Sequence, residues 1–140
     1  RAIDFPRAML HEGLNVSFGG LKTAVINHVR QHPAVATADV AASFQQAVVD
    51  VLVAKTIRAV ESTGVKSVAL GGGVAANSLL RQRMAEESAS RGWHLVLPSR
   101  AMCTDNAAMI ASAAWYRLRD GVTSSLDMEA LPNLKLGDPL

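Results

Sequence analysis

The residues best suited to chemistry in this sequence are three consecutive glycines, Gly71–Gly73. They follow a short run, residues 66–70, that is typical of a strand, and they precede a stretch with helical spacing. Glycine lets the backbone turn sharply and lets a ligand approach the peptide amides closely. The N-terminus of a following helix adds unpaired N–H groups and partial positive charge, which suit a phosphate. The same glycines also suit a tight turn packed on a sheet, and the motif alone favours neither interpretation.

Two polar residues lie where loops lead into predicted helices. Asn77 falls in the first turn of the helix after the glycines, where it can cap the helix or reach the ribose or amide of a ligand. Asp105 stands at the predicted start of the last helix, with Thr104 as a competing cap. Spacing alone favours capping for both Asn77 and Asp105. The functional alternative for Asp105 is a carboxylate that holds a cation against bound phosphates.

Other candidate motifs are weaker. The glycine spacing over Gly71–Ala76 also matches a dinucleotide-binding fingerprint, with Ser99 and Arg100 at the end of the next strand, where an NADP phosphate can lie. A long helix pair precedes the first strand, however, and too little chain follows to complete that sheet. A Walker A loop is excluded because no Gly-Lys-Ser/Thr follows the glycines. The four histidines lack ligand spacing, and Cys103 has no evident base partner.

Periodicity and chain breakers predict the elements that must position these residues. Helical spacing predicts a first helix over 21–31, which stops before the His32-Pro33 pair. The remaining predicted elements are a long helix from about 37 or 39 to 62, a strand over 66–70, a helix over 75–91, a strand over 94–97 and a last helix over 105–119. The predicted order is therefore α-α-β-α-β-α, followed by a turn-rich tail.

The long predicted helix has a single narrow polar stripe. Its members recur at steps of three and four residues apart from one gap: Asp39, Ser43, Gln46, Asp50, Arg58 and Glu61. The rest of the helix is apolar, with Val40, Phe44, Val48, Val51, Leu52, Ile57 and Val60. We expect the stripe to meet water and the remaining surface of the helix to be buried.

The predicted β-α-β stretch has the length of a parallel crossover unit. Parallel neighbouring strands end at the same edge of a sheet, so the loop at Gly71–Gly73 and the loop over 99–105 should lie side by side. Each loop leads into a helix N-terminus. Ligands of open α/β sheets bind in crevices at such carboxyl ends.

Composition excludes several classes of protein. With 49% hydrophobic and 19% charged residues and a net charge of +2, the chain is neither disordered nor strongly basic. The basic residues come close to clustering only at Arg81/Arg83 and Arg117/Arg119, which we interpret as solvated helix faces. No run of about 18 apolar residues predicts a membrane span. The lone Cys103 excludes a disulfide scaffold and fits a reducing compartment.

Four segments, in this order along the chain, resemble the later half of the tRNA threonylcarbamoyladenosine transferase (TsaD/Gcp) family. They are Ser17-Phe18-Gly19-Gly20-Leu21-Lys22-Thr23-Ala24-Val25, Ala42-Ser43-Phe44-Gln45, Leu70-Gly71-Gly72-Gly73-Val74-Ala75-Ala76-Asn77-Ser78 and Cys103-Thr104-Asp105-Asn106-Ala107-Ala108-Met109-Ile110-Ala111. Four matches in family order are far more specific than one glycine run. The family often has serine at Gly19 and alanine at Gly71, and both departures are mild.

The resemblance implies a fold and a reaction. The fold is an α/β, RNase H-like lobe of the actin, Hsp70 and sugar-kinase (ASKHA) superfamily, the C-terminal half of a two-lobe protein. The reaction transfers a threonylcarbamoyl group from threonylcarbamoyl-AMP to the adenine next to the anticodon of ANN-decoding tRNAs. Carried over by position, Asn77, Gly72 and Gly73 would bind the adenylate, and Asp105 would be a ligand of one iron or zinc ion. The resemblance identifies no catalytic side chain here.

The resemblance also implies what lies outside this sequence. The paired metal histidines of the family, spaced His-x-x-x-His, belong to the first lobe and are not found here. Because residue 1 is Arg rather than Met, we expect a piece cut from a longer cytoplasmic enzyme. We expect 1–20 to be a leading segment from the preceding lobe, 21–121 the lobe itself and 122–140 a tail.

The implied partners are tRNA, a paralogous dimerisation subunit and a small P-loop ATPase, without a membrane. The fragment alone should be inactive. The alternative is a non-catalytic dimerisation paralogue, which would be expected to lack the glycine loop and Asp105.

Overall fold

The computed structural model describes residues 2–129 and 131–133 of the chain, which form two compact units. The first unit is Arg1–Thr104 and the second is Asp105–Leu140. The division falls inside the segment 21–121 that the sequence analysis treats as one lobe. Asp105 is thus the first residue of the second unit, and each unit is described by itself.

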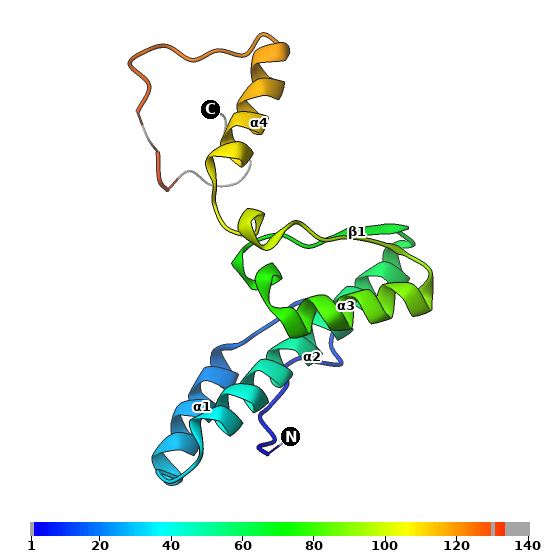
Figure 1. The fold of residues 1–140 in the computed structure, drawn as a ribbon, viewed down its shortest axis with the longest axis vertical. Coiled ribbons are helices and arrows are strands. Elements are labelled where there is room, and N and C mark those ends of the chain that lie inside the picture. Colours follow the sequence, from blue (N-terminus) through cyan, green and yellow to red (C-terminus); the bar gives the residue numbers. More distant parts are fainter. Residues whose placement is uncertain (1, 130, 134–140) are drawn as a thin grey trace. The chain divides into compact units, whose positions relative to one another are not determined.

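The observed elements follow the predicted α-α-β-α-β-α order, with two short 3-10 turns inserted (Figure 1). They are α1 (Gly19–Gln31), α2 (Thr37–Thr63), β1 (Ser67–Ala69), the 3-10 turn η1 (Gly73–Ala76), α3 (Ser78–Arg91), β2 (His94–Val96), the 3-10 turn η2 (Arg100–Met102) and α4 (Ala107–Arg119). Glycine ends two helices as expected: Gly64 after α2 and Gly92 after α3 have φ of 69° and 73°.

The strands β1 and β2 pair in parallel, as predicted, with Val68 opposite Leu95 at the centre of the register. These two side chains are the partly buried ones of their strands and contact the core. That core is a cluster contributed by α2, α3 and the residue before β2: Val49, Val53, Leu80, Met84 and Trp93. Figure 1 shows α2 and α3 running next to each other beneath the sheet. A second cluster joins the leading segment to α1 and α2 through Phe5, Leu21, Val40 and Ala47.

The prediction that the polar stripe of α2 faces water is wrong for the middle of the stripe. Residues 2–13 pack along the middle of the stripe. Ser43 is 3% exposed, and its hydroxyl accepts a hydrogen bond from the Ile3 N–H at 3.1 Å. The leading segment thus covers the polar side of the helix. The apolar side is less covered than predicted, since Phe44 is 41% exposed.

By length and composition alone, α2 can cross a membrane. Its contacts are those of a core helix. It supplies Val49 and Val53 to the main cluster and buries Lys55, which is 5% exposed and donates to the carbonyl oxygens of Met9, Glu12 and Gly13. We therefore interpret α2 as the central helix of the first unit.

Candidate functional site

The glycine loop opens at the carboxyl edge of the sheet. The last hydrogen bond between the two strands runs from the Leu70 N–H to the Val96 carbonyl at 3.1 Å, and the chain leaves the sheet at Gly71. Gly72 has φ 81° and ψ 168°, a conformation that side chains other than glycine rarely adopt. A Cβ added at Gly71 or Gly72 would meet no other residue within 4 Å. The loop is therefore open on its outer surface, where a ligand can approach the backbone.

The sequence predicts one helix after the glycines. The structure has a 3-10 turn, η1, followed by α3 instead. Hydrogen bonds from the Ala75 N–H to the Gly72 carbonyl and from the Asn77 N–H to the Val74 carbonyl close the turn, at 2.9 and 3.0 Å. Asn77 has extended backbone angles and begins α3 as its N-cap. Its extended backbone angles, φ −62° and ψ 124°, interrupt the helical run, so the helix predicted from residue 75 begins only at Ser78.

Asn77 makes two side-chain contacts. Its Oδ1 accepts from the Leu80 N–H at 2.9 Å, which confirms the predicted capping role. Its Nδ2 donates to Oε1 of Gln45 on α2, also at 2.9 Å. An amide nitrogen carries two hydrogens, so one donor remains after the Gln45 contact. A ligand contact by Asn77 is compatible with this geometry and stays a prediction.

As predicted, the loop after β2 lies beside the glycine loop. This holds for the part of that loop that ends at Thr104. A Cβ added at Gly73 would meet the Thr104 methyl group at 4.0 Å, an ordinary contact. Cys103 is 2% exposed. Its thiol donates a hydrogen bond to the Ser99 carbonyl at 3.4 Å, which closes the turn η2. Cys103 therefore holds this loop together from within.

Arginine side chains bridge the two loops, which the sequence patterns did not predict. Arg81 on α3 donates to the carbonyl oxygens of Ala75, at 3.0 Å, and Pro98, at 2.9 Å. Arg100 on η2 donates to the Ser78 hydroxyl at 2.8 Å. The interpretation of Arg81 as part of a solvated face is thus wrong. A usable signal was present: a long side chain in the first turns of a helix points back toward the helix N-terminus.

In the second unit, the cap of α4 is Asn106, so the capping predictions for Asp105 and Thr104 are wrong. The Oδ1 of Asn106 accepts from the Met109 N–H at 3.1 Å, and α4 begins at Ala107 rather than at Asp105. Asp105 is exposed, and the capping role is already filled by its neighbour. The carboxylate of Asp105 is therefore not used for the cap of α4.

Among residues 2–129 and 131–133, no three histidine, cysteine, aspartate or glutamate side chains are placed to hold one ion. Asp105 can supply at most one carboxylate to such an ion, and its role as a ligand stays a prediction. The remaining ligands of such an ion would have to come from outside the described part of this chain.

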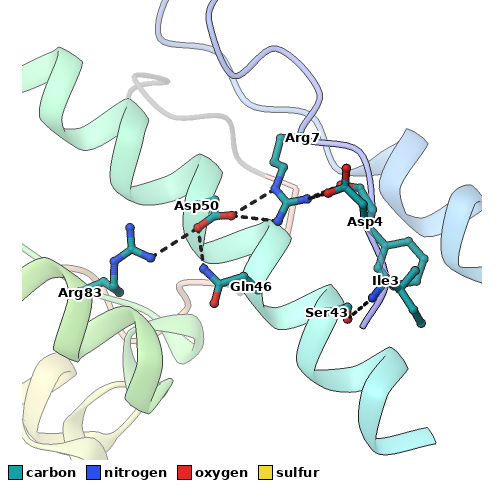
Figure 2. A network of polar contacts seen from close by, with 8 residues as sticks. Ile3, Asp4, Arg7, Ser43, Gln46, Asp50 and Arg83 are labelled. Atoms are coloured by element: carbon teal, nitrogen blue, oxygen red, sulfur yellow. Dashed lines mark hydrogen bonds and ion pairs between the residues drawn. The ribbon is translucent and has the colours of Figure 1, made fainter. Parts of the chain in front are cut away.

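A polar network centred on Asp50 joins the leading segment, residues 2–13, to α2 and α3 (Figure 2). The Asp50 carboxylate accepts from Nε and Nη2 of Arg7 at 3.1 and 2.9 Å, from Gln46 at 2.6 Å and from Arg83 at 3.5 Å. Burial raises the pKa of Asp50, but the hydrogen bonds from Gln46 and Arg7 and the charges of Arg7 and Arg83 outweigh it. The net effect is a pKa below the usual value for aspartate.

The sequence of this chain matches a known protein family and several curated proteins. Residues 1–112 match the family model described as TsaD: tRNA N6-adenosine threonylcarbamoyltransferase. Similar curated proteins, each named tRNA N6-adenosine threonylcarbamoyltransferase, occur in Geobacter sp. (strain M21), Geobacter metallireducens and Clostridium botulinum (strain 657). In that order, they are identical to this chain at 54% of 136 aligned residues, 49% of 140 and 49% of 142. The alignments cover 94%, 96% and 98% of this chain, respectively. The chain spans about two fifths of the length of these relatives, 40–42%.

Proposed function

Because the chain belongs to the TsaD family of tRNA N6-adenosine threonylcarbamoyltransferases, we propose that it forms the C-terminal, RNase H-like lobe of such an enzyme. The whole protein would be an acyltransferase of the ASKHA superfamily. It would move the threonylcarbamoyl group from threonylcarbamoyl-AMP to the exocyclic amine of the adenine next to the anticodon of ANN-decoding tRNAs. This chain would contribute the part of the cleft that binds the adenylate.

The open glycine loop at the carboxyl edge of β1 is the observation that carries this proposal. Gly72 and Gly73 are exposed, and the surface outside Gly72 is free of side chains. Their backbone N–H groups would donate to phosphate oxygens of the adenylate, and the N-terminus of α3 follows after the turn η1. Asn77 would add the amide hydrogen that Gln45 leaves unused.

Asp105 would serve as one ligand of an iron or zinc ion, completed by histidines outside this chain. When bound, the ion would supply a Lewis acid that stabilises negative charge on an oxygen of the substrate. The carboxylate of Asp105 would contribute negative charge and an oxygen donor to this ion. Its exposure, together with the capping role of Asn106, supports this assignment.

The remaining expectations concern the whole protein. Its partners would be tRNA, a paralogous dimerisation subunit and a small P-loop ATPase, and its compartment the cytoplasm. A non-catalytic dimerisation paralogue is less well supported, because the glycine loop and Asp105 are both present and the relatives are named as transferases. An NADP-binding fragment is not supported by the family match.

Titration of the full-length protein with AMP, followed by calorimetry, tests the adenylate site. Gly73→Ala adds a methyl group in the gap between the two loops, where it meets the Thr104 methyl at an ordinary distance, so the fold should tolerate it. We expect AMP affinity to fall about tenfold, because the methyl group separates the phosphate from the loop amides. Gly71→Ala, whose methyl group would meet nothing within 4 Å, is the matched control. Equal affinity in the wild-type protein and the Gly73 variant would refute the site.

A further inference from the structure

The side chain of Arg81 connects the two loops of the candidate site. Its Nη1 donates to the Ala75 carbonyl and its Nη2 to the Pro98 carbonyl, at 3.0 and 2.9 Å. Nη1 also lies 3.9 Å from the sulfur of Cys103. Ala75 belongs to the turn that follows Gly72, whereas Pro98 and Cys103 belong to the loop after β2. One half-buried guanidinium thus contacts both loops.

This contact stands where the sheet no longer holds the loops together. Beyond the hydrogen bond from the Leu70 N–H to the Val96 carbonyl, the two strands end, and the chain continues into the turns η1 and η2. A guanidinium is planar and presents its donors in a fixed fork, so it sets the separation of the two carbonyls it joins. A flexible ammonium on a lysine does not fix two acceptors in this way.

We infer that Arg81 is a positioning residue that holds the Gly72–Gly73 amides at a fixed spacing from the loop over 98–103. It acts through the Ala75 and Pro98 carbonyls and does not touch the ligand. The effect on ligand binding rests on the proposed adenylate site, whereas the bracing of the two loops rests on the contacts alone.

The experiment uses the full-length protein and compares three variants. Arg81→Met keeps the aliphatic stem and removes all donors, and Arg81→Lys keeps the charge but not the planar fork. The matched control is Arg83→Met, which removes an arginine from the same helix whose partner is Asp50 rather than either loop. Amide hydrogen exchange is measured in peptides that cover 70–77 and 98–104, and AMP affinity is measured by calorimetry.

We expect both Arg81 variants to exchange faster than wild type in both loops at once and to bind AMP about tenfold more weakly. The Arg83 variant should match wild type in both loops and in AMP affinity. Exchange that stays at the wild-type rate, or that rises in only one loop, would overturn the brace. Wild-type AMP affinity in the Arg81→Lys variant, with fast exchange in both of its loops, would also overturn the brace. Arg81 would then act on AMP binding through its charge.

The two proposals fail separately. If the wild-type protein does not bind AMP, the adenylate site is refuted, whereas the exchange rates still decide whether Arg81 braces the loops.

Discussion

At the scale of single residues, Asn77 combines a structural contact with a spare donor. Its Oδ1 caps α3 and its Nδ2 reaches Gln45, which leaves one amide hydrogen. The capping role predicted from spacing and the binding role implied by the family are therefore compatible in one side chain. Substitutions can separate them because aspartate and asparagine cap helices about equally well.

We predict that Asn77→Asp in the full-length protein keeps the stability of α3 but weakens AMP binding at least tenfold. The carboxylate still accepts from the Leu80 N–H, but it donates nothing and repels a phosphate. Thermal unfolding and calorimetry with AMP measure the two effects. Asn77→Ala, by contrast, should also lose about 1 kcal/mol of stability with the cap. Undiminished AMP binding by the aspartate variant would leave Asn77 as a cap only.

A second prediction separates Asp105 from its neighbour. In the full-length protein, Asp105→Asn should lower the metal content by at least half, because an amide brings no negative charge to the ion. Asn106→Ala should instead cost about 1 kcal/mol of stability, since it removes the cap of α4, and should leave the metal content unchanged. Elemental analysis and thermal unfolding measure the two quantities. A fully loaded Asp105→Asn protein would contradict the ligand assignment.

At the scale of elements, α2 is stabilised by polar contacts to a segment with no regular structure. Arg7 binds Asp50 through two hydrogen bonds, and Lys55 and Arg58 donate to carbonyl groups of residues 9–13 (Figure 2 shows the first of these). The buried ammonium of Lys55 has a lowered pKa because burial and the Arg58 charge disfavour its charged form more than Glu12 favours it. These contacts dock the leading segment on the helix.

We predict that Asp50→Asn destabilises the chain by about 2 kcal/mol at pH 7, as expected for hydrogen bonds to a charged group. The lowered pKa of Asp50 means that the carboxylate contributes stability above its unfolded-state pKa of about 3.9 and that this contribution is lost as the pH falls through the folded-state value. The difference from wild type should therefore shrink below about pH 4. Urea unfolding at pH 7 and pH 3 measures it.

The control for this experiment is Glu61→Gln. Glu61 pairs with Arg91 on the surface, where its side chain is 61% exposed, and such pairs contribute little. A loss of stability for Asp50→Asn that is as small as that of the control, or that stays constant from pH 7 to pH 3, would contradict the role of the network.

The sequence predicted the elements well where a period or a breaker marks them. The order of elements, the parallel pair and the ends of α2 and α3 at Gly64 and Gly92 are confirmed. Helix starts were missed by two residues at α1 and α4 and by three at α3. Ala75 and Ala76 favour a helix but belong to the turn η1, and before α4 three consecutive residues, 104–106, can all act as caps. The cover on the α2 stripe was missed because residues 2–13 have no periodic pattern.

At the scale of the whole molecule, the chain spans about two fifths of its curated relatives. The glycine loop and Asp105 are present, but the described residues supply no complete metal site. We predict that the chain alone folds and transfers no threonylcarbamoyl group to tRNA, because the proposed site would lack its other metal ligands and the proposed opposite lobe. Mass spectrometry of nucleosides from treated tRNA measures the product. Repeated turnover by the isolated chain would contradict the two-lobe proposal.

The sheet itself has a practical consequence for work on the isolated chain. Within the described residues, β1 and β2 are hydrogen-bonded as strands only to each other, so each three-residue strand has one edge outside the ladder. Open strand edges act as templates for pairing with other chains. Val96, which is 46% exposed, adds an apolar side chain at the outward face of β2. We therefore expect samples of the isolated chain to self-associate as their concentration rises, and sedimentation at increasing concentration measures this.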